Sequence, residues 1–199
     1  MAYSVIAIER EYASGGREVG EKLAAKLKIP CYGQEILEKA AAKLKLPLES
    51  LTDAEENMTG SFLYGLVALT NISSGKETDY LSLEQRLSGV EDEVIREMAK
   101  ERCVIVGRAA SALLADKKNV LKVFVHADYT ARVNRAASKY GVDKKQAGAV
   151  LRRQDKRRAN YFKVATGLEW KDGDIYHIFL NSGKIGIDNV VEILYGMAK

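Results

Sequence analysis

The stretch Arg10–Gly20, REYASGGREVG, combines small residues and arginines in a way that favours phosphate binding. It follows the short apolar run Val5–Ile8 and precedes a run with helical spacing. A loop between a strand and a helix gathers backbone N–H groups at one place, and the helix dipole adds partial positive charge there. The small residues of Ala13–Gly16 would let a phosphate approach these N–H groups closely.

This stretch departs from the phosphate-loop pattern G-x-x-x-x-G-K-[ST]. Matching the second glycine places Gly16 and Arg17 at the Gly-Lys positions, and Glu11 then replaces the first glycine. Matching from the end of the strand instead puts Gly16 at the Lys position. We favour the first alignment, because a guanidinium grips phosphate oxygens in pairs. Arg10 is then a second candidate cation, and Glu18 replaces the magnesium-binding Ser or Thr. The alternative is a glycine-rich turn with Arg17 paired to a surface acid.

A basic segment, Leu151–Lys163, is the second candidate for phosphate chemistry. On a helix, Arg153 and Arg157 lie one turn apart on one face. Phosphoryl transfer spreads negative charge over three oxygens and needs cations where that charge develops. We predict that Arg153 and Arg157 stabilise the transferring group, with Asp155 orienting one of them.

Two other interpretations of the basic segment stay open. It could be a solvated charged face. It could also bind a nucleic-acid backbone while Tyr161 and Phe162 stack on bases. The net charge of +4 over 199 residues is weak support for nucleic acid.

Apolar runs alternate with helical patterns along the chain, which predicts parallel strands joined by helical crossovers. Ligands of such sheets bind beyond the carboxyl ends of the strands. The phosphate-loop stretch, Gly107-Arg108 and the segment 181–183 all follow predicted strands, so we expect them to meet there. Strands are predicted at 3–8, 29–33, 103–108, 120–127 and 175–181, and helices at 16–28, 34–45, 83–100, 128–140, 143–159 and 188–197.

Composition predicts a protein that buries a substantial core, with 47% hydrophobic and 29% charged residues. The sequence lacks an apolar run of the roughly 20 residues that a membrane span needs, and no signal peptide is evident. Cys31 and Cys103 form no disulfide framework, so a reducing cytoplasm is expected, with both as small buried hydrophobes.

The whole chain resembles the cytidylate kinase-like family. The resemblance rests on five stretches in the family's order: IEREYASGGREVG, VIVGRAA, KVFVHA, DKRRANYFKVATGLEW and YHIFLNS. It implies a three-layer α/β/α P-loop NTPase fold, with a five-stranded parallel sheet of order 2-3-1-4-5 and helices on both faces. Residues 1–199 would form one nucleoside monophosphate kinase-like domain. Its core would be 1–33, 100–142 and 174–199, with an acceptor-binding insert at 34–99 and a helical lid at 143–173.

The resemblance also implies an activity, which is transfer of the γ-phosphoryl group of ATP, with Mg²⁺, to a nucleoside monophosphate such as CMP or dCMP. Arg108 falls at the acceptor-phosphate arginine of the DGRD motif of true cytidylate kinases, but Val106 and Ala109 replace both aspartates. The loop lysine is missing as well. The residues that would hold the donor phosphates, or a phosphate or sulfate ion, are Ser14, Gly15, Gly16, Arg17 and Glu18.

Several other residues have weaker assignments. Tyr32, Gln34 and Glu35 could contact a base or ribose, or could simply cap and solvate a helix. Arg132 and Arg135 face away from the predicted apolar side of their helix, where Tyr129, Val133, Ala136 and Ala137 would point inward. They would support the lid or lie at the surface. His126 and His177 are expected to be structural, and Trp170 is expected to pack the return segment of the lid.

Three functions follow. The first is a cytidylate kinase-like phosphotransferase. The second is a nucleotide- or phosphate-binding protein without kinase activity, which the missing loop lysine and aspartates motivate. The third is nucleic-acid binding through residues 152–163. The sequence leaves open the acceptor, the oligomeric state, and whether Glu9, Glu11 or Glu18 contacts Mg²⁺.

Overall fold

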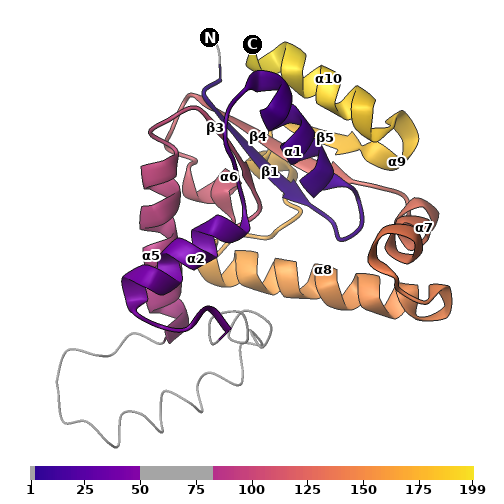
Figure 1. Cartoon of the computed structure of the whole chain (residues 1–199), viewed down its shortest axis with the longest axis horizontal. Helices are drawn as coiled ribbons and strands as arrows, with labels where there is room; N and C mark the ends of the chain where they lie inside the picture. Colours follow the sequence, from indigo (N-terminus) through magenta and orange to yellow (C-terminus); the bar gives the residue numbers. More distant parts are fainter. Residues whose placement is uncertain (1–2, 50–82) are drawn as a thin grey trace, which may run out of the picture.

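The computed structural model describes residues 3–49 and 83–199, with the side chains of 83–85 left out. Its centre is a parallel sheet of five strands in the order β2-β3-β1-β4-β5 (Figure 1). The register pairs Val5 with Cys103 of β3 and with Val120 of β4. This order confirms the sequence prediction and puts β1 in the middle, where its carboxyl end is flanked by those of β3 and β4.

The strands are short and apolar, as buried parallel strands are. They are β1 (Val5–Arg10), β2 (Cys31–Tyr32), β3 (Cys103–Val106), β4 (Val120–His126) and β5 (Ile178–Asn181). The helices are α1 (Gly16–Leu27), α2 (Gln34–Leu44), α5 (Leu83–Met98), α6 (Ala110–Leu113), α7 (Tyr129–Tyr140), α8 (Lys144–Thr166), α9 (Ser182–Ile185) and α10 (Ile187–Ala198), with a 3₁₀ turn at Gly173–Ile175.

Helices cover both faces of the sheet (Figure 1). On one face, α1 and α10 pack on the side chains of Ile6, Ile8 and their neighbours in β3 and β4. On the other, α2, α5 and α6 pack on Val5, Ala7 and Ile105. The alternation along β1 explains this, because successive side chains of a strand point to opposite faces. The sheet is therefore buried on both sides, as its uninterrupted apolar strands require.

The helix α8 crosses the carboxyl end of the sheet (Figure 1). Phe162 of α8 lies with Trp170 and Tyr176 against Phe124 of β4, and all four side chains are buried. The ring centroids of Phe124 and Trp170 are 5.3 Å apart. The prediction that Trp170 packs the segment returning from α8 is thus confirmed.

Several element boundaries differ from the sequence prediction. The first strand runs to Arg10 rather than Ile8, α8 continues to Thr166 rather than 159, and β5 begins at Ile178. The strands β2 and β3 are shorter than predicted. The helix α8 is longer because Phe162 continues its inward face past the basic run. Residues 50–82, which belong to the expected acceptor-binding insert at 34–99, lie outside the described residues.

The predicted inward face of α7 is right at Ala136, which is buried, and at Val133, which packs on the same cluster, but it is wrong at Tyr129. Tyr129 is 61% exposed, whereas Arg132 is 7% exposed. Arg132 can occupy a buried position on α7 because it forms ion pairs with two carboxylates, as described below. Asp128 precedes α7 as predicted, but its side chain accepts a hydrogen bond from Asn181 rather than capping the helix. Within residues 3–49 and 83–199, every helix is too short or too polar to cross a membrane.

Candidate functional site

The loop between β1 and α1 has the geometry of an anion-binding turn. Ala13 and Gly15 adopt left-handed backbone conformations, with φ of 59° and 82°. The N–H and the hydroxyl of Ser14 both donate to the carbonyl of Glu11, which closes the turn. Gly15 precedes α1, and among the described residues no side chain caps this helix. The first N–H groups of α1 therefore stay available to an anion, with the helix dipole behind them.

One side of the loop is held by a cluster of ion pairs, which we call the paired cluster: Glu11, Arg132, Asp155 and Lys171. The guanidinium of Arg132 lies 3.1 Å from the carboxylate of Glu11 and also binds that of Asp155. It donates to the carbonyl of Tyr12 at 2.8 Å as well. Lys171 pairs with Glu11, and Asp155 accepts from the N–H of Tyr12 at 2.8 Å. Every charge here has a partner within the protein.

The paired cluster corrects two predictions. Asp155 binds Arg132 and the loop backbone, so the expectation that it orients Arg153 or Arg157 is wrong. Arg132 is a buried tether between α7, the loop and α8, so the prediction that it faces away from the apolar side is also wrong. Both errors have one cause, because a buried arginine facing two acids from distant parts of the chain leaves no local pattern.

Glu18, at the Ser/Thr position of the loop pattern, points toward α7. Its carboxylate binds Arg135 and, at 3.2 Å, Lys22. The hydrogen bond from Arg135 lowers the pKa of Glu18. Arg135 thereby ties α7 to the first turn of α1 and is partly buried rather than at the surface.

A pocket of about 320 Å³ opens on the other side of the loop. It brings together three arginines and the residues after β2 that the sequence assigned to an acceptor, Tyr32 and Gln34. Its described lining is Arg10, Arg17, Glu21, Cys31, Tyr32, Gly33, Gln34, Glu35, Leu37, Val106 and Arg108. The predicted meeting of the loop with the end of β3 is thus observed.

Arg17 lies at the mouth of this pocket. Its side chain is 72% exposed, and its Nε donates to Glu21 at 2.8 Å. The pairing of Arg17 with a surface acid, which the sequence left as an alternative, is what the structure has. Glu35 instead accepts from the N–H of Gly33 and so closes the turn before α2.

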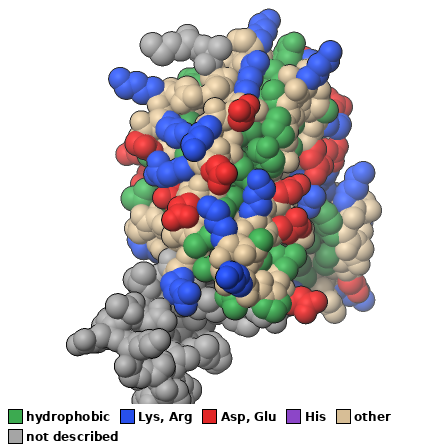
Figure 2. All heavy atoms as spheres, turned by 60° about the vertical axis from the view of Figure 1, so that its left-hand side comes forward, with side chains coloured by type: hydrophobic (Ala, Val, Ile, Leu, Met, Phe, Trp, Pro, Cys, Tyr) green, Lys and Arg blue, Asp and Glu red, His purple; other side chains and the backbone are tan. Residues whose placement is uncertain are grey.

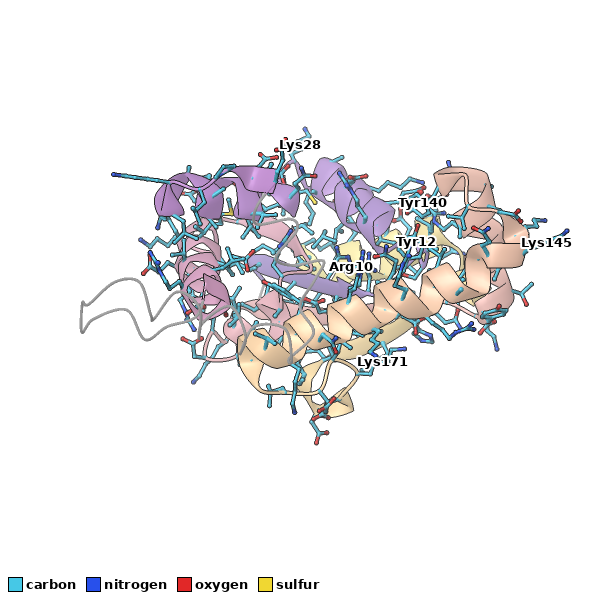
Figure 3. All side chains as sticks on the ribbon, turned by 90° about the horizontal axis from the view of Figure 1, so that it is seen from below. Arg10, Tyr12, Lys28, Tyr140, Lys145 and Lys171 are labelled. Atoms are coloured by element: carbon cyan, nitrogen blue, oxygen red, sulfur yellow. The ribbon has the colours of Figure 1, made fainter. Side chains whose placement is uncertain are left out.

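Arg10 extends inward from the end of β1 (Figure 3). Its Cβ lies against Gly16, and its guanidinium lies against Gly107 at the end of β3. A Cβ at Gly107, where φ is 80°, would sit 1.8 Å from a guanidinium nitrogen of Arg10. Burial lowers the pKa of Arg10, while the nearby Glu9 carboxylate opposes that shift. Arg10 therefore runs from the loop into the pocket that it helps to line.

Arg108 lies on the pocket wall in a second network. Its guanidinium donates to Glu91 of α5 at 3.0 Å, and the hydroxyl of Tyr161 donates to the other oxygen of Glu91 at 2.6 Å. Burial raises the pKa of Glu91 to about 7, and the Tyr161 hydrogen bond opposes this rise. Burial also lowers the pKa of Arg108. Glu91 thus joins the pocket arginine to α8, a link that the sequence did not predict.

Arg158, which the sequence analysis did not select, is the arginine of α8 that points inward. It donates to the carbonyl of Arg10 at 2.9 Å and lies over the ring of Tyr12. Burial lowers its pKa to about 9, and the nearby Arg10 charge adds to this. By contrast, Arg153 is exposed. The spacing of Leu151, Asp155, Arg158 and Phe162 could have identified this inward face.

Glu9 is a second buried acid, whose charge acts on Arg10, Arg108 and Arg158. It is 3% exposed, and its Oε2 accepts from the indole N–H of Trp170 at 3.3 Å. Its Oε1 has no hydrogen-bond partner among the described residues. Burial raises the pKa of Glu9, and the charges of Arg10 and Arg158 oppose this rise. Elsewhere in the described ranges, no three His, Cys, Asp or Glu side chains gather as a metal site would require.

The chain matches a known protein family over most of its length. A model of the cytidylate kinase-like family matches residues 5–184. The chain belongs to this family. The sequence resemblance is therefore confirmed over nearly the whole chain, and the loop, the end of β3 and α8 all lie within the match.

Three solved structures share the fold. An uncharacterized protein from Eubacterium ventriosum has a TM-score of 0.72 at 26% identity, covering 98% of this chain and 97% of that one. Shikimate kinase from Bacteroides thetaiotaomicron has a TM-score of 0.54 at 12% identity, covering 96% of each chain. TT1252 from Thermus thermophilus has a TM-score of 0.51 at 14% identity, covering both chains fully. The chain thus has a P-loop kinase fold.

Among curated proteins, no sequence matches significantly. The family match and the fold support a nucleotide-dependent kinase in general.

Proposed function

We propose that this protein transfers the γ-phosphoryl group of ATP to a small acceptor that carries a phosphate, of the nucleoside monophosphate class, with CMP and dCMP as the first candidates. One observation carries this proposal: the stem of Arg10 lies against the uncapped N-terminus of α1, and Arg10 lines a pocket together with Arg17 and Arg108. Such an arrangement suits two phosphate-bearing substrates that meet end to end.

The donor phosphates would bind the loop. The N–H groups at the start of α1 and the small residues Ser14, Gly15 and Gly16 form a cradle, with Arg17 at its rim. A side chain at Gly15 would meet Ile187 at 2.7 Å, so this turn needs glycine. The loop fits phosphate, because its donors are backbone N–H groups with no competing side chain.

The acceptor would bind in the pocket beside β2. Arg108 would hold its phosphate, and Tyr32 and Gln34 would contact the base or ribose. A phosphate bound there would compete with Glu91 for Arg108, since the carboxylate holds the same guanidinium. Residues 34–99 would then be the acceptor-binding insert, and residues 143–173 the lid.

The lid helix would contribute further cations. Arg157 lies one turn before Tyr161, whose hydroxyl binds Glu91 beside the pocket. Arg153 lies a further turn away and is exposed. Closure of the lid over bound substrates would exclude water from the transferring group.

ATP and Mg²⁺ are the cofactors of this proposal. Mg²⁺ bound with the nucleotide would neutralise charge on the β- and γ-phosphates. Among the described carboxylates near the loop, Glu11 and Glu18 are paired with cations, whereas Glu9 has a free oxygen. Glu9 is therefore the carboxylate best suited to meet the ion.

A second candidate function is nucleotide or phosphate binding without transfer. It is favoured by Val106 and Ala109, which replace acids, and by the position of Arg17, which pairs with Glu21. The nucleic-acid hypothesis gains less support. On the face that Figure 2 shows, the positive and negative side chains of the described residues interleave and form no single basic patch. The inward Arg158 also removes one cation from the basic run.

The test is an assay of the purified chain with Mg-ATP and a panel of nucleoside monophosphates, with products separated by chromatography. The expected product is ADP with one diphosphate, formed from CMP or dCMP fastest. Arg108→Ala should raise the KM for the acceptor more than it lowers kcat. Tight ATP binding with no product from any acceptor would instead support the binding function.

A further inference from the structure

Four guanidinium groups converge where β1 and β3 end. Arg10, Arg17 and Arg108 line the pocket, and Arg158 approaches Arg10 from α8. Arg17 pairs with Glu21, and Arg108 pairs with Glu91. Within the described ranges, neither Arg10 nor Arg158 forms an ion pair with a carboxylate.

Both side chains are nevertheless partly buried. Burial lowers the pKa of both arginines. The charges of Arg108 and Arg17 add to this shift at Arg10, and the charge of Arg10 adds to it at Arg158, where Asp155 and Glu9 oppose it. Glu9 faces both, but its own pKa is raised by burial and it binds Trp170. A desolvated charge without an ionic partner is costly, and a dianion between two such charges would remove that cost.

The surrounding chain places both side chains beside the loop. Gly16 and Gly107 leave room for Arg10, because a Cβ at either position would overlap its side chain. Arg158 is held by the carbonyl of Arg10 and the ring of Tyr12. Two guanidiniums that already lie beside a phosphate-binding loop need little reorganisation when an anion arrives.

We propose that Arg10 and Arg158 form a cation pair that binds the terminal phosphoryl group of the donor, with Arg10 taking the place of the missing loop lysine. Arg17, although aligned with that lysine in the sequence, lies at the exposed rim and binds Glu21. The phosphate-binding role of the loop lysine would thus belong to the last residue of β1 rather than to the first turn of α1. That the bound anion is the phosphate of a donor rests on the proposed function, whereas the existence of an anion site does not.

The cation pair would stabilise the negative charge that develops on the γ-phosphoryl oxygens during transfer. As the bond between the γ-phosphorus and the ADP oxygen breaks, and the bond to an acceptor phosphate oxygen forms, negative charge spreads over the three remaining oxygens. Arg10, which runs from the loop into the pocket, would contact that group from the sheet, and Arg158 would contact it from α8. Each guanidinium can donate two parallel hydrogen bonds to phosphate oxygens.

The test uses inorganic pyrophosphate as the probe, titrated into the purified full chain by calorimetry at fixed ionic strength. Arg10→Ala and Arg158→Ala should each weaken pyrophosphate binding about 10- to 100-fold, as expected for lost charge-assisted hydrogen bonds. The matched control is Arg152→Ala, an exposed arginine on the same helix, which should bind like the wild type. Circular dichroism checks that each variant is folded.

Conservative variants keep the test decisive if an alanine variant does not fold. Arg10→Lys and Arg158→Lys retain the charge but lose the two-pronged geometry, so each should weaken binding several-fold. Pyrophosphate binding equal to that of the wild type in the folded variants of Arg10 and Arg158 would overturn the proposal. So would a wild-type chain that does not bind pyrophosphate at millimolar concentration.

A separate measurement distinguishes this inference from the proposed function. A wild-type chain that binds pyrophosphate through Arg10 and Arg158, yet transfers no phosphate from Mg-ATP, would support the anion site and contradict the kinase. Where transfer is observed, Arg10→Ala should lower kcat more than it raises the KM for the acceptor.

Discussion

The two sides of the phosphate loop carry similar numbers of charges but use them differently. On the side of α7, Arg132 and Lys171 meet Glu11 and Asp155, and every charge is matched inside the protein. On the side of β3, Arg10 and Arg158 lack carboxylate partners in the described part of the chain. Both sides lie at the carboxyl ends of the strands, so position alone does not separate them.

The difference indicates which arginines hold the structure and which await a ligand. Arg132 is matched by two carboxylates and a backbone carbonyl, so it holds its neighbours in position and offers little to a substrate, because its hydrogen bonds are already made. An unmatched buried cation is poorly stabilised by the protein and gains most from an anion. The comparison therefore assigns the paired cluster to tethering and the β3 side to binding.

The strongest challenge to this comparison is Arg132→Ala. It would leave the buried carboxylates of Glu11 and Asp155 without their shared cation, and such losses cost about 3–5 kcal/mol. We expect the free energy of unfolding, measured by urea denaturation, to fall by that amount. The control is Lys43→Ala, since the exposed pair of Lys43 with Glu93 should contribute little. A variant as stable as the wild type would mean that the paired cluster does not tether the loop.

The sequence predicted the scaffold well, and the reason is physical. The strand order and the acceptor-side residues come from the family resemblance. The loop before α1 and its meeting with the end of β3 follow from local patterns, and from the rule that parallel strands end at one edge. The roles of the arginines do not. The sequence offers Arg17 and Arg10 as equivalent candidate cations. In the structure Arg10 points inward because Gly16 and Gly107 leave space for its side chain. Glu91 and Tyr161 lie 70 residues apart, so no spacing could pair them.

The β3 side contains a carboxylate whose charge should depend on pH. Burial raises the pKa of Glu91 from 4.5 to about 7 in the folded protein. Between these values the folded state binds more protons than the unfolded state, so this group makes the free energy of unfolding fall as pH rises. The contribution is complete below pH 4.5, is lost by about pH 7, and is on the order of 3 kcal/mol.

Glu91→Gln should remove this dependence, because the amide does not titrate. Urea denaturation of wild type and variant from pH 4.5 to 7.5 should give a steeper decline for the wild type. Glu93→Gln, an exposed acid on the same helix, is the matched control and should follow the wild type. Parallel curves for wild type and Glu91→Gln would show that Arg108 keeps Glu91 ionised, which would move it to the matched class.

Substitution of two glycines should have the smallest effect on stability, and it tests most directly whether the anion binds at the loop. Gly15 and Gly141 both have left-handed backbones, so alanine at either should cost about 1–2 kcal/mol. Their surroundings differ, because a Cβ at Gly15 would meet Ile187 at 2.7 Å, whereas none of the described atoms lies within 4 Å at Gly141. Gly15→Ala should also weaken pyrophosphate binding, while Gly141→Ala should lose stability alone. Equal pyrophosphate affinity in the two variants would mean that the loop does not contribute to the anion site. Arg10 and Arg158 would then bind the phosphate without the loop.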